Sequence, residues 1–112
     1  MEEQLKITLS QTIASFNNNR AAILRLALNN GGDEAIEKVE NEYDTLRSAY
    51  FEILRNELDA NHHLYEQLIT ATNSETERLK KSVLSLNNIN EIIKLTTEVI
   101  NLIGRILIVL AI

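Results

Sequence analysis

The sequence predicts an all-α protein, a three-helix antiparallel bundle with a long αα-hairpin and coiled-coil-like packing. The 112 residues include no proline and three glycines, so residues that break helices are almost absent. Hydrophobic residues make up 45% of the chain, which is enough apolar surface to form a core and argues against a disordered chain. They recur at spacings of three, four and seven, as on a helix with one apolar face. We expect one helical-bundle domain over residues 1–112, with helices at about residues 3–28, 33–72 and 75–111.

The first predicted helix covers residues 3–28, and its apolar stripe consists of Leu5, Leu9, Ile13, Phe16, Ile23 and Ala27. Three asparagines at residues 17–19 interrupt the pattern. Because their side chains can occupy the solvent face, we expect the helix to continue through them. It should end within residues 29–33 (NNGGD), since Asn and Gly readily adopt the left-handed conformation that terminates helices. Asp33 can then cap the next helix.

The second predicted helix, residues 33–72, carries a coiled-coil heptad. Six successive a and d positions are filled by Ile36, Val39, Tyr43, Leu46, Tyr50 and Ile53. At Glu57 this register fails, and the apolar stripe moves to Phe51, Leu54, Leu58, Tyr65 and Leu68. Such a shift is typical of a helix that changes its packing partner.

The end of the second helix has two candidate positions. A Ser-x-x-Glu capping box starts the next helix if the break lies at residues 72–74, and a weaker Asn-x-x-Glu box does so if it lies at residues 87–88. The first break gives an αα-hairpin with nearly equal arms, whereas the second leaves a helix of about 80 Å largely without cover. We therefore expect the break at residues 72–74. The inner seam of the last helix would then consist of Leu79, Val83, Leu86, Ile93, Ile100 and Leu107.

These helix lengths predict an asymmetric bundle. Three helices should pack near the turn at Gly31 and Gly32, and two should form a thinner tip around residues 62–86. The tip carries more apolar surface than one facing helix can cover, namely Leu64, Leu68, Ile69, Leu79, Val83 and Leu84. We expect a second copy of the chain to cover it, because twofold homodimers are the commonest soluble oligomers.

Charge and composition exclude several classes of function. The net charge is −5, and residues 33–66 hold ten acidic against three basic residues. Binding to nucleic acid needs a concentrated basic face, so no nucleic-acid partner is expected. The absence of cysteine excludes disulfides and thiolate metal sites. The first residues are acidic and lack the apolar segment of a secretory signal, which favours a cytoplasmic protein.

No catalytic, cofactor-binding or metal site is predicted. Asp59, His62 and Glu66 share a helical face and match half of the Glu-x-x-His pattern of di-metal carboxylate bundles, with a shorter acid at the first position. The other half of that pattern is missing, so we interpret His62 and His63 as surface residues or a mild pH sensor. The chain has no Gly-x-Ser-x-Gly elbow and no phosphate-binding glycine loop. We expect neither enzymatic activity nor a cofactor.

The C-terminal residues 99–112 are apolar nearly all round. As a helix these fourteen residues are shorter than the roughly 20 needed to cross a bilayer, and they include Asn101 and Arg105. We interpret them as a helix covered on several sides within the core. The alternative is a segment that dips into a membrane.

The heptad and the under-covered tip favour a non-enzymatic, self-associating helical-bundle protein that acts as an interaction or scaffolding module. We expect a homodimer or higher homo-oligomer, with another protein as a further candidate partner. The alternative function is a membrane-associating helical bundle that uses the apolar C-terminal segment 99–112.

Overall fold

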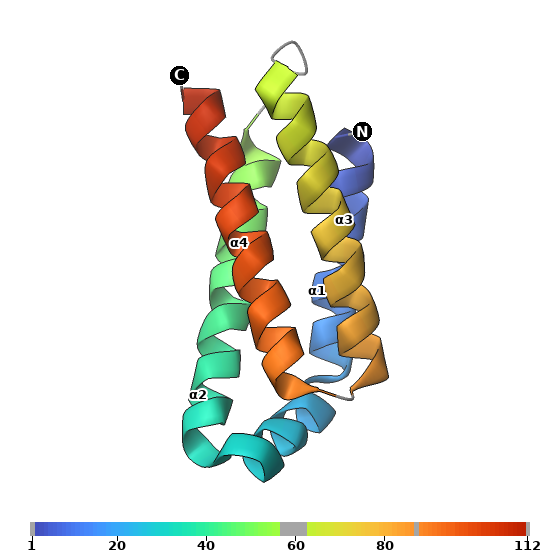
Figure 1. Ribbon diagram of the computed structural model, residues 1–112, viewed down its shortest axis with the longest axis vertical. Coiled ribbons are helices and arrows are strands. Elements are labelled where there is room, and N and C mark those ends of the chain that lie inside the picture. The colour runs from blue at the N-terminus through green and yellow to red at the C-terminus, as the bar shows by residue number, and fades with distance from the viewer. Residues whose placement is uncertain (1, 57–62, 87, 112) are drawn as a thin grey trace.

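The computed structural model describes residues 2–56, 63–86 and 88–111, and every regular element in these ranges is a helix. The all-α prediction is therefore confirmed. The helices, which number four in the described ranges and not the predicted three, are α1 (Glu2–Asn18), α2 (Arg20–Arg55), α3 (His63–Ser85) and α4 (Ile89–Ala111) (Figure 1).

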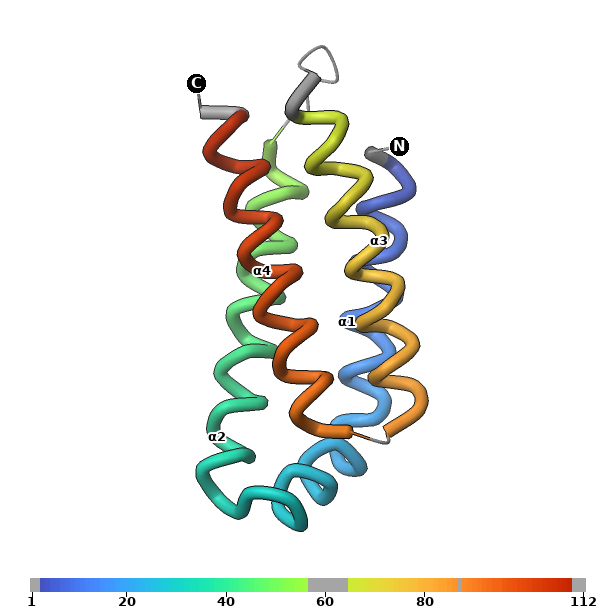
Figure 2. Tube along the Cα trace, viewed as in Figure 1, coloured from blue at the N-terminus to red at the C-terminus, as the bar shows by residue number. Residues whose placement is uncertain are grey.

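The four helices form an elongated bundle measuring 46 × 21 × 19 Å. Contacts join α1 to α2, α2 to α4, α4 to α3 and α3 to α1. Helices α2 and α3, although consecutive in sequence, therefore lie on a diagonal of the bundle. Helices α1 and α3 run in one direction, and the long upper part of α2 runs with α4 in the other (Figures 1 and 2).

The first helix is shorter than predicted, because α1 ends at Asn18 and the chain bends at Asn19. Asn19 has φ −103° and ψ 12°, and its side-chain amide donates a hydrogen bond of 2.8 Å to the carbonyl oxygen of Ser15. An asparagine side chain that bonds to the backbone in this way competes with helix propagation. The prediction of one helix over residues 3–28 is wrong for this reason. The apolar stripe itself is correct, with Ile13 partly buried and these members fully buried: Leu5, Leu9, Phe16, Ile23 and Ala27.

A sharp corner at Gly32 divides α2 into two parts. Gly32 has φ 69° and ψ −155°, a conformation that is essentially restricted to glycine. A Cβ atom on Gly31 would lie 2.6 Å from the Cβ atom of Ala35, so glycine is also needed there. Residues 20–31, the base segment, cross the lower end of the bundle, and residues 33–55, the long arm, run along it (Figure 2). The predicted interruption within residues 29–33 is confirmed.

The heptad of the long arm packs inside the bundle. Val39, Tyr43, Leu46 and Ile53 are buried, and the two remaining heptad residues are partly buried. The ring of Tyr43 stacks on that of Phe16, with centroids 4.5 Å apart. The prediction of one continuous helix over residues 33–72 is wrong, because α2 ends at Arg55, where Asn56 has an extended backbone (φ −98°, ψ 137°), and α3 begins at His63. Glu57, where the heptad register fails, lies outside the described residues.

The expected helix break at residues 72–74 is wrong, because α3 continues through them to Ser85. Thr72 and Thr76 are fully buried against the neighbouring helices, and their hydroxyl groups are satisfied within α3 because they donate to carbonyl oxygens four residues earlier, at 2.6 and 2.7 Å. The break lies instead between Ser85 and Ile89, at the alternative position that includes residues 87–88. There Leu86 adopts φ 53°, and Asn88 Oδ1 accepts a hydrogen bond of 3.2 Å from the backbone N–H of Glu91. The hairpin therefore consists of α3 and α4, with 23 residues each.

The predicted two-helix tip is also wrong, because α3 packs against both α1 and α4. Ile69, Leu79 and Val83 are buried, whereas Leu84 remains 57% exposed. The side chain of Leu64 lies outside the described part of the structure. Among the described residues, the buried members of this region are therefore covered by α1 and α4.

The buried face of α4 differs from the predicted seam. Ile93, Ile100 and Leu107 are only partly buried, and the fully buried apolar residues are Ile89, Ile92, Leu95, Val99, Ile103 and Ile106. Because α4 contacts α2 on one side and α3 on the other, the centre of its buried face lies between these two neighbours.

We predict opposite effects for alanine at two glycines. Gly32→Ala forces a side chain into a backbone conformation that disfavours it and should lower the free energy of unfolding by about 1–3 kcal/mol. Gly104→Ala, inside α4 where an added Cβ meets open space, should raise it by roughly 0.5–1 kcal/mol. Urea unfolding followed by circular dichroism measures both. Equal effects of the two substitutions would contradict a strained corner at Gly32.

Two further substitutions distinguish the two positions of the helix break. Asn88→Ala removes the side-chain cap of α4 and should cost about 1 kcal/mol of stability. Ser74→Ala, at an exposed site inside α3, should be neutral or slightly stabilising. The same unfolding assay measures both variants. If Ser74→Ala were the more destabilising of the two, the helix break would lie at residues 72–74.

Candidate functional surface

One side of the long arm of α2 faces away from the other helices. We call it the outer face, and it consists of six exposed residues, Asp33, Glu37, Asp44, Ser48, Phe51 and Arg55. Their spacings of three, four and seven place them on one side of the helix. The outer face is acidic where the long arm begins, and it carries an aromatic ring and an arginine where the long arm ends.

The apolar end of the outer face is centred on Phe51. Phe51 is 48% exposed, and Leu54 beside it is 42% exposed. The Phe51 ring contacts the partly buried ring of Tyr50, with centroids 5.8 Å apart. A shallow hollow of about 790 Å³ adjoins these side chains and is lined in part by Thr45, Ser48 and Ala49. Large apolar groups therefore lie beside small ones on the same surface.

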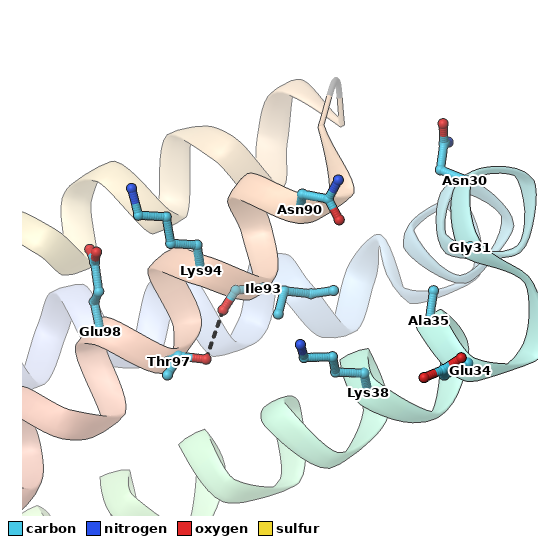
Figure 3. Close-up of a pocket in the computed structure, with 10 residues that line it drawn as sticks. All are labelled: Asn30, Gly31, Glu34, Ala35, Lys38, Asn90, Ile93, Lys94, Thr97 and Glu98. Atoms are coloured by element: carbon cyan, nitrogen blue, oxygen red, sulfur yellow. Dashed lines mark hydrogen bonds between the residues drawn. The ribbon is translucent and has the colours of Figure 1, made fainter.

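A second groove, of about 550 Å³, lies between α2 and α4 near the corner at Gly32 (Figure 3). Its walls include Lys38 of α2 and Thr97 of α4, whose hydroxyl lies 2.8 Å from Glu42 Oε2 and 3.0 Å from the Ile93 carbonyl oxygen. Lys94 and Glu98 of α4 point away from α2 (Figure 3). The charged groups along this groove do not converge on one point, as a specific ligand site requires.

Two carboxyl groups meet across the contact between α3 and α4. Glu75 Oε1 accepts a hydrogen bond of 2.8 Å from Arg78, and Glu75 Oε2 is hidden from solvent. A hydrogen bond with Glu98 lowers the pKa of Glu75, and the same bond raises the pKa of Glu98. Opposite pKa directions of this kind are those of a carboxyl pair in which the protonated group, Glu98, donates to the ionised Glu75.

The metal-site hypothesis falls largely outside the described residues. Asp59 and His62 are among the residues not described, and Glu66 is exposed on α3. Within the described ranges, no group of three or more acidic or histidine side chains is arranged to hold a metal ion. Tyr43 and Tyr65 are buried in the core, as expected of residues on the apolar stripes.

Sequence reasoning missed two features of this surface. It placed Phe51 and Leu54 on a covered stripe, whereas both are exposed. Phe51 directly follows Tyr50 and Leu54 directly follows Ile53, so each is turned about 100° around the helix from a heptad residue, and this offset was the available signal. It also missed the pair Glu75–Glu98, which depends on the position of the turn between α3 and α4.

Comparison with protein-family models, curated proteins and solved structures finds no match. Within the described parts of the chain, no helix combines the length and apolar character needed to cross a bilayer. Functional inference therefore rests on the surface itself.

The acid pair predicts how stability depends on pH. Because the pKa of Glu98 is raised above its ordinary value of 4.5, the stability that the shared proton contributes is present at acidic pH and is lost as the pH rises through that raised pKa. Glu98→Gln keeps a hydrogen-bond donor at every pH. The melting temperature of this variant minus that of the wild type should therefore become more positive as the pH rises from about 4.5 to 7.

Thermal unfolding at several pH values measures this difference. Glu66→Gln is the matched control, because it removes one negative charge from an exposed position on α3. A difference between Glu98→Gln and wild type that stays constant with pH, or that follows the control, would show that no proton is shared.

Proposed function

We propose that the protein is a non-enzymatic, self-associating helical bundle that acts as an interaction or scaffolding module. The observation that carries this proposal is the exposed apolar end of the α2 outer face, where Phe51 and Leu54 adjoin a hollow lined by small side chains. Apolar surface is more stable out of water, so a partner that covers these side chains would bind favourably. Aromatic residues are also enriched among the side chains that contribute most to protein interfaces.

The support for self-association differs from that expected from the sequence. The heptad is buried within the chain, and the region around α3 is covered by α1 and α4. Both features therefore bury apolar surface that the sequence prediction assigned to a second copy, although Leu84 stays 57% exposed. Of the exposed large apolar side chains that the structure describes, Phe51 and Leu54 lie together beside a hollow, whereas the other four lie on the other helices or on the base segment.

The polar features described above support a non-enzymatic role. The groove between α2 and α4 holds charged groups that do not converge, and Glu75 is engaged by Arg78 of its own helix. An active site instead places a nucleophile, a base and charge-stabilising groups around one point.

The membrane-associating alternative stays a prediction. It requires segment 99–112 to leave the bundle, because Val99, Ile103 and Ile106 are buried. The cytoplasmic location expected from the sequence also stays a prediction.

Sedimentation equilibrium tests self-association directly. The average mass of the wild-type chain should rise above the monomer value of 12.7 kDa at concentrations of about 10–100 μM, the range of a modest interface. Phe51→Ser should shift this rise to higher concentration. Ile7→Ser, at a 47% exposed apolar position on α1, is the matched control and should leave it unchanged. A wild-type chain that remains monomeric throughout this range would contradict the proposal.

A further inference from the structure

We propose that a second copy of the chain binds the outer face of α2 through an antiparallel pairing of the two long arms about a twofold axis near Leu46. This inference rests on the proposed function and names the surface, the direction and the register of the self-association. Three features of the outer face lead to it.

The first feature is helical alignment. Glu37 and Arg55 are 18 residues apart, which is five turns at about 3.6 residues per turn, so they project from the same side of α2. Asp33 and Phe51 are separated by the same interval. All four side chains are exposed, and the Arg55 side chain, which is ion-paired with Glu52 of the same helix, is 70% exposed. A partner helix laid along the long arm would therefore meet all of them.

The second feature is the division of charge along the long arm. On the outer face itself, residues 33–44 contribute three acids (Asp33, Glu37 and Asp44), whereas residues 45–56 contribute one base, Arg55. In an antiparallel pair each acidic half lies beside the arginine half of the other copy, which is attractive. A parallel pair would place the acidic halves together. Charge complementarity therefore favours the antiparallel direction.

The third feature is the register. The midpoint between Glu37 and Arg55 is residue 46, so a twofold axis at that level places Arg55 beside the partner's Glu37, and Glu37 beside the partner's Arg55. The same axis places Phe51 at the level of the partner's Asn41. Asn41 is exposed, so the ring can pack against it.

A basic helix from another protein is the competing occupant. It would match the acidic half of the outer face, but it would leave Arg55 beside like charge. A second copy matches both halves at once.

Charge reversal of the full-length chain tests the pairing by sedimentation equilibrium. Arg55→Glu places two acids beside each other at both symmetry-related contacts, and Glu37→Arg places two arginines there. Each single variant should weaken dimerisation about tenfold. The double variant restores opposite charges and should return the dissociation constant to within about threefold of wild type. Arg25→Glu, at an exposed position of the base segment, is the control and should have no effect.

Mixing the two single variants gives a second readout that does not depend on the double variant folding. In a mixed dimer Glu37 of one chain meets Arg55 of the other, and the introduced glutamate meets the introduced arginine. An equimolar mixture should therefore associate more strongly than either variant alone. If wild type dimerises but neither the mixture nor the double variant recovers affinity, the antiparallel pairing is wrong while self-association stands. If wild type is monomeric, both proposals fail, and a different protein becomes the candidate occupant of the outer face.

Discussion

The arrangement of the bundle depends on burying the broad apolar face of α4 against neighbouring helices. Its fully buried residues, such as Val99, Ile103 and Ile106, point between two neighbouring helices, because a helix with so broad an apolar face cannot be covered by one partner. Helices α2 and α3 provide this cover from either side, which places them on a diagonal. Helix α1 then packs against both and closes the fourth side. The corner at Gly32 makes this possible, since it turns the chain from the base segment into a long arm that runs beside α4.

The apolar stripes and the corner could be predicted from sequence because each depends on residues close together in the chain. The stripe from Leu5 to Ala27 and the heptad from Ile36 to Ile53 are where helical periodicity places them. Gly31 and Gly32 mark the corner because other residues resist the backbone geometry or the close contact there.

The position of the second helix break could not be predicted in the same way. Both candidate positions carry capping residues, so local signals could not separate them. Long-range packing separates them, because Thr72 and Thr76 are buried against other helices and remain helical. The bend at Asn19 depends on one side chain bonding to the carbonyl oxygen of Ser15, which competes closely with helix continuation. The pair Glu75–Glu98 follows from the position of the break and could not be found without it.

Because the heptad and α4 are covered within the chain, interaction with a partner must use what remains outside. On the outer face of α2, acidic residues lie along one half of the long arm, and Phe51 and Arg55 lie along the other half. Division of charge along a single exposed helix favours one direction of pairing over the other. The same helix therefore contributes one side to the core and the opposite side to the proposed interface.

Native-state hydrogen exchange, followed residue by residue by NMR spectroscopy, tests most directly whether α4 is a core helix covered from both sides. The backbone amides of Ile92, Val99 and Ile103 should exchange only through global unfolding, with the same free energy as those of Val39 and Leu46 in α2. Exchange of the α4 amides at a distinctly lower free energy than those of α2 would show that α4 leaves the bundle on its own, and would contradict the arrangement.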